Sequence, residues 1–399
     1  MKQLLLWQWS VATSTSSLYL RPFFNRGTTG TSARSFLMPV EATLSNLCVE
    51  MTNWPWVWND VTFTMYAWPI GRDSTALSVT VSWTDTMGEN TTNSVVIPAW
   101  DSIQLFIDNP TRADLWLLRY SVDCEPTVDQ TFVISWNTSG NASAWTRYVS
   151  VNWWWATFAN ALDAWTYVPI NCTVKGIGVD LNSSTTGDYT FDLVKNGSVV
   201  ASTTVVLDSS STDNFEYLWW LNADISAWDF IALRYITNGA TARIISTAVV
   251  IEPDVTNEFF MSASSVGSIF NSTRYAAFYW THTSAPTTTE SPQLIWLTDL
   301  LVKGMRVSIG TAPWAWTRSF ELVKNSIVQS TSVDLTWTNT SGISTEDVLF
   351  TKWDTIESVW SRSWSVANTA DVHCSIVVAV PWWWEPPVSV SWGNFLHFF

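Results

Sequence analysis

The chain has 399 residues, of which only 13% are charged, and its formal net charge is −15. A protein whose main ligand is DNA or RNA normally presents a basic face, and an anionic membrane surface attracts positive charge, so this balance argues against both partners. The length is enough for two or three domains. Abundant Ser and Thr with few charged residues are typical of β-sandwiches.

The N-terminal stretch 1–6 becomes apolar at Leu4, but the chain soon runs into Ser and Thr. The apolar stretch is therefore too short for the hydrophobic region of a secretion signal. No stretch approaches the roughly 20 apolar residues of a membrane span. The sequence thus predicts no classical signal peptide and no insertion into a membrane.

Three segments of the chain read alike along its length. A strand-like run is centred on a Phe, and a Trp-Asp pair follows before the next apolar run; the copies are Phe63 with Trp100-Asp101, Phe191 with Trp228-Asp229, and Phe320 with Trp353-Asp354. Lys-Asn follows the Phe in the second and third copies, whereas Ala67-Trp68 stands there in the first. An interval near 128 residues is too long for a solenoid repeat and suits a whole domain.

Within each copy the apolar residues alternate with polar ones, as in a strand with one buried face. Val79 and Val81 alternate with Ser78 and Thr80. Asn196-Gly197 between two such runs predicts a hairpin turn. We therefore predict an all-β chain of three tandem antiparallel β-sandwich domains, jelly-roll-like, without helices. The stretches 137–143 and 251–257 are interpreted as linkers, which gives domains at 1–140, 141–254 and 255–399, the last with a short C-terminal tail.

Tryptophan is unusually frequent, with 30 residues against only 15 glycines. Glycine usually makes up about 7% of a chain, which predicts nearly twice that number. Adjacent tryptophans occur at 153–155 and 382–384, where turns and linkers would favour glycine. One hypothesis is that many of these positions are in-frame UGA codons, which some genetic codes read as Trp and others as Gly. The alternative is a chain of genuine aromatic platforms that bind sugars by stacking.

The alignment of the copies bears on this hypothesis. Gly187, four residues before Phe191, aligns with Trp316 in the third copy and with Asn59 in the first. Gly and Asn tolerate the left-handed backbone region that turns require, and Trp does not. We therefore expect Trp100, Trp228 and Trp353 to occupy equivalent turns. Trp296 aligns with Val168 at a strand-like position and is the exception that reads as a genuine indole.

Signals for catalysis are weak. His282, His373 and His397 have no metal-ligand spacing, and the four cysteines (Cys48, Cys124, Cys172 and Cys374) form no CxxC pair and read as buried free thiols. His373 reads as a structural strand residue. Asp101, Asp229 and Asp354 supply one carboxylate per copy, too few for calcium, and read as turn residues that bond nearby backbone N–H groups. No catalytic, cofactor or metal residue is assigned, and no enzymatic activity is expected.

With Gly in place of Trp, Thr43–Leu47, Thr311–Phe320 and Leu322–Asn325 resemble repeats of phage structural proteins. In those repeats "T-L-S-N-L", "A-P-G-A-G" and "F-T-L-x-K-N-G" precede an "A-G-D" turn. The resemblance extends over nearly the whole chain and is to β-sandwich modules of tail fibres and other virion surface proteins. Its motifs specify a fold more than an activity, so no functional residue is carried over.

The resemblance implies a non-enzymatic virion protein, a tail fibre or another surface-exposed component that attaches to the host. Its expected partners are other virion proteins and a host cell-surface glycan or protein, and fibres of this kind imply a homotrimer. The alternative function is a bacterial carbohydrate-binding or adhesin module. Tyr167, Tyr189 and Tyr217 would then remain as candidate sugar contacts even if most tryptophans were glycines.

Overall fold

The structure is a computed structural model of the whole chain. It describes the following residues: 3–9, 17–20, 36–51, 60–68, 73–109, 118–128, 130–137, 146–149, 164, 166–181, 187–207, 215–237, 245–265, 273–276, 278, 281–282, 294–295, 299–310, 312–313, 317–336, 338–362 and 372–381. Secondary structure in these ranges is almost entirely β-strand, and they contain no α-helix. The all-β prediction is confirmed.

The first two-sheet unit is built from nine strands. One sheet has the order β1-β9-β4-β7 and the other has the order β2-β8-β5-β6, with β3 paired to β8. All these pairs are antiparallel. The strands are β1 (Gln3–Trp9), β2 (Ser17–Leu20), β3 (Phe36–Leu37), β4 (Ala42–Met51), β5 (Val61–Trp68), β6 (Asp73–Val81), β7 (Met87–Ile97), β8 (Ser102–Asp108) and β9 (Leu118–Pro126).

The second unit repeats this plan. Its sheets have the orders β10-β19-β13-β17 and β11-β18-β14-β15, with β12 paired to β18 and β16 to β14. The strands are β10 (Phe132–Asn137), β11 (Arg147–Val149), β12 (Thr166–Tyr167), β13 (Cys172–Leu181), β14 (Tyr189–Lys195), β15 (Ser198–Val199), β16 (Val205–Leu207), β17 (Phe215–Ile225), β18 (Phe230–Thr237) and β19 (Ile245–Pro253).

The third unit follows the same plan with one added strand. Its sheets have the orders β22-β20-β30-β24-β27, with β28 paired to β24, and β21-β29-β25-β26, with β23 paired to β29. The strands are β20 (Glu258–Ser265), β21 (Arg274–Ala276), β22 (Thr281–His282), β23 (Leu294–Ile295), β24 (Leu300–Ile309), β25 (Thr317–Lys324), β26 (Ile327–Thr336), β27 (Ser341–Ser344), β28 (Val348–Phe350), β29 (Thr355–Arg362) and β30 (Val372–Ala379).

The strand order identifies the fold of each unit. In the first unit, β1-β9-β4-β7 and β2-β8-β5-β6 place the first strand beside the last and the second beside the next-to-last, apart from the short β3. The equivalent strands of the other two units have the same order. Two antiparallel sheets joined in this double Greek-key order make a jelly roll. Each unit is therefore a jelly roll, as the sequence pattern predicts.

Alternation of side chains explains why these segments form half-buried strands. Along β6, Leu77, Val79 and Val81 are buried, whereas Thr80 between them is exposed. The buried faces of both sheets meet in one core; in the first unit this core contains Leu44 of β4 and Phe63 of β5. Two amphipathic sheets bury their apolar faces only by packing on each other, which makes the sandwich the stable solution.

The hairpin predicted at Asn196-Gly197 is confirmed. Lys195 pairs with Ser198, and both turn residues have positive φ, +49° and +83°, as a type I′ turn requires. Asn325 and Ser326 form the equivalent turn between β25 and β26. In the first unit the connection is longer: Ala67 pairs with Asp73, whereas Lys195 pairs with Ser198 in the second unit.

Two features of the structure bear on the expected boundaries. Strand β10 pairs with β19, so residues 132–137 belong to a sheet of the second unit, and residue 137 is the last residue of that strand. Residues 251–253 belong to β19, which leaves only 254–257 as a link to β20. One apolar core runs through both the second and third units. Their independence as domains therefore stays a prediction.

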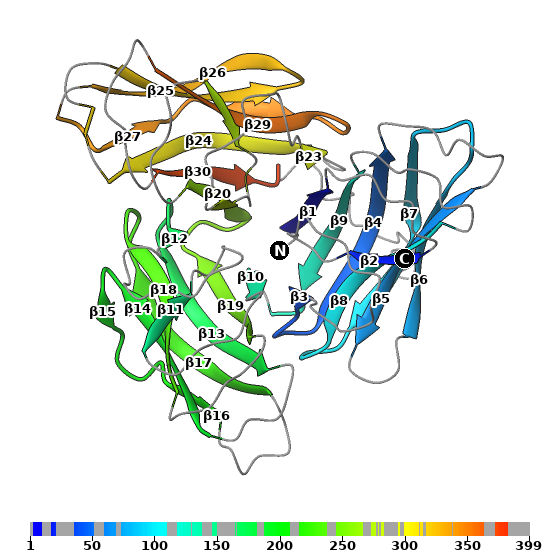
Figure 1. Cartoon of the computed structure of the whole chain (residues 1–399), viewed down its shortest axis with the longest axis horizontal. Helices are drawn as coiled ribbons and strands as arrows, with labels where there is room; N and C mark the ends of the chain where they lie inside the picture. Colours follow the sequence, from blue (N-terminus) through cyan, green and yellow to red (C-terminus); the bar gives the residue numbers. More distant parts are fainter. Residues whose placement is uncertain are drawn as a thin grey trace, which may run out of the picture.

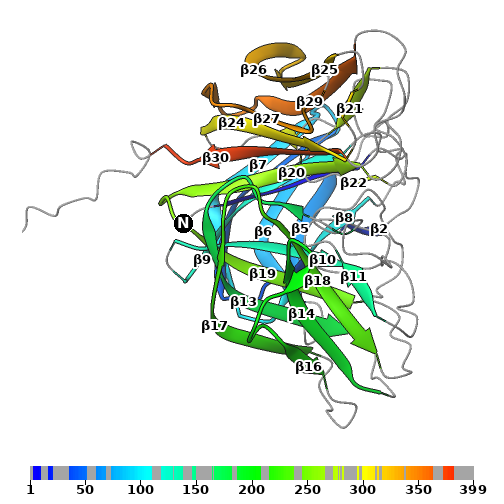
Figure 2. The ribbon, with the colours of Figure 1, turned by 90° about the vertical axis from the view of Figure 1, so that its left-hand side faces the viewer.

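The three units lie around a common centre, with β1, β10 and β20 nearest to it (Figure 1). In the view rotated by 90°, the strands of all three units extend over the same width, so the units lie side by side in one layer (Figure 2). The tryptophans at 54–58, 153–155, 296, 314–316 and 382–384, with Asn59 and His397, lie outside the described residues.

Candidate assembly interface

Each unit contains one tight turn before the strand equivalent to β8, and we call these turns the corners. The first residue of each corner accepts a hydrogen bond from the N–H of the fourth, at 3.3, 3.0 and 3.0 Å. The third residue has a φ of +76°, +85° and +76°. These are type II turns, whose third position favours glycine. The corners are Pro98–Asp101, Ser226–Asp229 and Thr351–Asp354, and the third residue is Trp in all of them, so the prediction of equivalent turns is confirmed.

The carboxylate of Asp229 fastens the second corner to the hairpin between β14 and β15. It accepts hydrogen bonds from the backbone N–H of Ser226 at 2.7 Å and from Nδ2 of Asn196 at 2.6 Å, and Lys195 Nζ lies at 2.8 Å. Burial alone would raise the pKa of Asp229, but these bonds hold it below its usual value. Asn196 also accepts a bond from the N–H of Phe230 at 2.9 Å.

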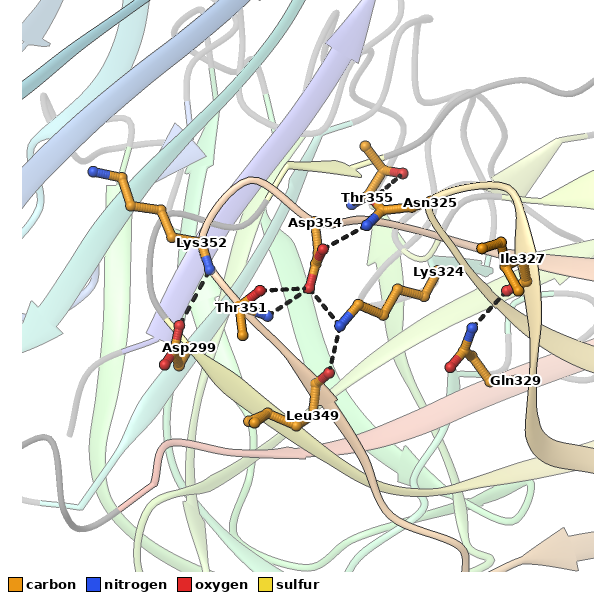
Figure 3. Close-up of polar contacts among 10 residues, drawn as sticks. All are labelled: Asp299, Lys324, Asn325, Ile327, Gln329, Leu349, Thr351, Lys352, Asp354 and Thr355. Carbon is orange, nitrogen blue, oxygen red and sulfur yellow. Dashed lines mark hydrogen bonds and ion pairs between the residues drawn. The ribbon is translucent and has the colours of Figure 1, made fainter.

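The third corner repeats the arrangement, as Figure 3 shows. Asp354 accepts bonds from the N–H of Thr351 at 2.6 Å and from Nδ2 of Asn325 at 2.5 Å, and it forms an ion pair with Lys324 at 2.6 Å. The pKa of Asp354 is lowered because these bonds outweigh its burial. Thr355 N–H donates to Asn325 Oδ1 at 2.8 Å. The prediction that these aspartates are turn residues bonding backbone N–H groups is confirmed for Asp229 and Asp354.

The first corner has the same turn without this fastening. Ala67 and Trp68 occupy the positions of Lys and Asn, so the ammonium and amide groups that bind Asp229 and Asp354 have no counterpart at these two positions of the sequence. Burial raises the pKa of Asp101. The turn conformation therefore does not depend on the Lys-Asn-Asp contact, which is an added restraint in two of the three units.

A short extended segment, which we call the strap, runs beside each corner; it contains β3, β12 or β23. In the first unit the N–H of Trp100 donates to Met38 O at 2.6 Å, and Met38 N–H donates to Asp101 O at 2.8 Å. The second unit repeats the exchange through Val168 with Trp228 and Asp229, at 2.8 and 3.0 Å. Strap and corner thus form one block in the first two units, and in the third unit the strap strand β23 pairs with β29, which directly follows the corner.

The first block contacts the second unit. Strand β3 lies against β10 and β19, and Leu37 N–H donates to Ser135 Oγ at 3.0 Å. Beside it, Gln3 of β1 exchanges hydrogen bonds with the backbone of Val133. The ring of Trp100 stacks on Tyr217 with centroids 4.3 Å apart.

The second block contacts the third unit with equivalent elements. Strand β12 lies against β20 and β30, and Tyr167 O accepts bonds from Ser262 Oγ at 3.5 Å and Ser375 Oγ at 3.3 Å. The guanidinium of Arg306 lies 4.7 Å from the ring centroid of Trp228. We call each contact between two units a seam. Aromatic contacts, including Phe132 with Phe260, extend this seam toward the common centre of the three units.

The third block contacts the first unit and completes the circle. Strand β23 lies against β9 and β1. Lys352 Nζ forms an ion pair with Glu89 at 2.6 Å, and Trp353 packs against Cys48. Each strap therefore contacts the first and last strands of the next unit, and each corner contacts another strand of the same sheet. The arrangement is a closed, head-to-tail ring with pseudo-threefold symmetry.

Most of the residues that the sequence offered as candidates for metal, catalytic or sugar contacts are buried. All four cysteines are free and buried on strands, as predicted. His373 is a buried residue of β30 against Phe230, and burial lowers its pKa to about 4. Among the candidate sugar contacts, Tyr167 and Tyr189 are buried, and Tyr217 is exposed. Within the described ranges no three His, Cys, Asp or Glu residues are grouped to hold a metal ion, and no helix is long and apolar enough to cross a membrane.

Sequence reasoning identified the corner aspartates but did not predict their partners. The recurring Lys-Asn before a recurring Trp-Asp was the available signal, since two motifs that repeat together at fixed spacing can be in contact. For the seam residues Gln3, Ser135 and Glu89 no sequence signal exists.

No family model and no curated protein matches the chain. Among solved structures, the triple jelly roll fold and turret assembly in an archaeal virus is 13% identical, with 87% of this chain and 80% of that chain covered and a TM-score of 0.18. Infectious bursal disease virus is matched twice: its Gx strain (9% identity, 95% and 80% coverage, TM-score 0.19) and its VP2 subviral particle (10%, 96% and 80%, TM-score 0.20). These TM-scores are too low to assign a function.

Proposed function

We propose that the chain is a non-enzymatic structural protein of a virus particle, a tail-fibre or other surface component that contacts the host. The observation that carries this proposal is that the repeated motifs lie at the contacts between units. The corner and the strap of every unit contact the next unit, and the Lys-Asn-Asp contacts brace two of the corners. Motifs devoted to joining units are expected of a scaffold, whereas an enzyme would bring acid, base or nucleophile side chains together.

The test is to locate the chain on purified particles. Antibodies raised against the recombinant chain, used with gold labels in negative-stain microscopy, should mark intact virions at regular positions. Label on fibres supports the tail-fibre assignment, and label over the shell assigns the chain to the coat instead. Particles that contain no chain by immunoblot and carry no label would refute the virion role.

We also propose that glycine is the native residue at positions 100, 220, 228 and 353, through UGA codons read as glycine. Three of these are type II turn positions, and Trp220 has a φ of +63° where the pairing of β13 with β17 is irregular. A bulky residue at positive φ is strained by about 1–3 kcal/mol. Trp220 is 96% exposed, so no packing offsets its strain.

The intact mass of the chain isolated from its source tests this proposal. Each Trp replaced by Gly lowers the mass by the same amount, and peptide sequencing locates the changes. Glycine at 100, 220, 228 and 353 with tryptophan at the buried Trp360 is the expected pattern. Tryptophan at all four positions would refute the recoding.

A second candidate function, carbohydrate binding, is favoured by one observation. Phe215 and Tyr217 are exposed on β17, and Trp100 stacks against both rings. Exposed aromatic faces can stack on sugar rings in a bacterial adhesin module. Binding to a glycan array that is lost in Tyr217→Ala and kept in Val206→Ala, another exposed apolar position, would favour this function over the structural one.

A further inference from the structure

The three seams of the ring differ in how the chain connects them. Residues 127–131 join β9 to β10 across the first seam, and residues 254–257 join β19 to β20 across the second. The third seam, between the third unit and the first, has no such link. Among the described residues, it is held by contacts between residues far apart in the sequence.

The third seam is also the least apolar in the part of the chain that the structure describes. A continuous core joins the second and third units, and the core of the first unit includes Val133 and Val250 of the second. At the third seam, Cys48 with Trp353 forms a small separate cluster. Beside it, Lys352 and Glu89 form an ion pair with side chains 39% and 37% exposed. Exposed pairs of this kind contribute little stability, about 0–1 kcal/mol.

A head-to-tail contact has two complementary faces, and either face can be satisfied by the same chain or by another one. Here one face is the corner block of the third unit, and the other is the face of the first unit that carries Glu89 and Cys48. Within one chain the two faces are held near each other, which raises their effective concentration to the millimolar range. Closure within the chain therefore dominates in dilute solution.

We propose that the third seam is an exchangeable docking surface whose other partner is a second copy of this chain. When the seam opens, the corner block of one molecule binds the first unit of its neighbour through Lys352 and Glu89. The outcome is a swapped dimer or a longer head-to-tail assembly. The first and second seams stay closed, because their links and apolar contacts hold them.

The ion pair and the missing link carry this inference, so it is independent of whether residue 353 is Trp or Gly. It is also independent of the proposed virion role. A chain that does not occur in particles can still exchange its third seam, and a virion protein can keep it closed. The two proposals therefore fail separately.

A zero-length crosslink reads out the partner of Lys352. Equal amounts of ¹⁴N-labelled and ¹⁵N-labelled full-length protein are mixed, exposed to about 1 M salt to screen the pair, and returned to low salt at increasing protein concentration. A carbodiimide then joins Lys352 Nζ to the Glu89 carboxyl as an amide with loss of water. Mass spectrometry of the crosslinked peptide distinguishes same-isotope from mixed-isotope products.

The Lys324–Asp354 pair is the matched control, because both residues lie within the third unit at the same 2.6 Å separation. Its crosslink should stay within one isotope at every concentration. Mixed-isotope Lys352–Glu89 product should rise with protein concentration, and Lys352→Gln should remove it. Mixed product at Lys352–Glu89 that never exceeds the level at Lys324–Asp354 would overturn the proposal.

Charge-reversal variants give a second, independent test. Lys352→Glu and Glu89→Lys each place like charges across the seam of one chain, whereas a mixture of the two restores opposite charges between chains. Native mass spectrometry should show several-fold more dimer in the mixture than in either variant alone, and the double variant should return to monomer. A mixture with no more dimer than its components contradicts exchange.

Discussion

The first corner and the third corner have the same backbone but different side-chain restraints. Both are type II turns with a φ of +76° at the third residue. Asp354 in the third is bound by Lys324, Asn325 and Thr351, whereas Asp101 in the first has Ala67 and Trp68 where the lysine and asparagine would be. The comparison teaches that the type II turn forms at the same place in the jelly roll with or without the lysine and asparagine. The carboxylate contacts add stability to a conformation that exists without them.

The largest expected effect separates tryptophans that suit their backbone from those that do not. Trp360 is buried in β29 against Phe320, and Trp360→Ala should destabilise the fold by about 3–5 kcal/mol. Trp220→Gly should instead stabilise it by about 1 kcal/mol, because it relieves positive-φ strain and removes almost no packing. Urea unfolding of both variants measures the two free energies. Loss of stability in Trp220→Gly would contradict the strain assigned to that position.

Removing the aspartate should distinguish the fastened corner from the unfastened one. Asp354→Ala leaves Asn325 Nδ2 and the N–H of Thr351 without their acceptor, while Lys324 keeps its bond to Leu349 O, and the change should lower the free energy of unfolding by about 2 kcal/mol. Asp101→Ala, the matched control in the first unit, should change it by less than about 0.5 kcal/mol. Denaturant titration of both variants provides the measurement. Equal losses would mean that the Lys-Asn contacts contribute nothing.

Acid should loosen the fastened corners while it leaves the first one in place. The pKa values of Asp229 and Asp354 are lowered in the folded protein, so their stabilising contribution is present above the unfolded value of about 4 and is lost as pH falls through the folded pKa. The pKa of Asp101 is raised, so its contribution has the opposite sign: stability decreases as pH rises toward its folded pKa. Carboxyl chemical shifts followed by NMR between pH 2 and 6 should show Asp354 titrating below Asp101. The reverse order would disprove the difference between the corners.

The smallest effect concerns the hairpin turns beside the corners. Gly197 and Ser326 occupy the same turn position with positive φ, +83° and +62°. Ser326→Gly should therefore stabilise the third unit by about 0.5 kcal/mol, and Gly197→Ser should destabilise the second by a similar amount. Thermal unfolding of the two variants measures both signs. Shifts of the same sign would show that the two turns are not equivalent.

Much of this fold follows from the sequence. The alternating pattern of Leu77 to Val81, the Asn196-Gly197 turn and the threefold recurrence of Trp-Asp predict strands, a hairpin and a repeated β-sandwich. These signals are local, since turn geometry and strand amphipathicity are properties of a few neighbouring residues. The recurrence of Trp-Asp also located the corners, where the structure finds positive φ.

The tertiary structure alone decided how the units meet. Strand β10 belongs to the second unit because its edge pairs with β19, and the sequence around residue 137 contains no sign of that pairing. The Lys352–Glu89 contact joins residues more than two hundred positions apart, and one lysine and one glutamate have no pattern to reveal it. Local chemistry specifies strands and turns, whereas the ring depends on the packing of complete surfaces that exist only once all three units have folded.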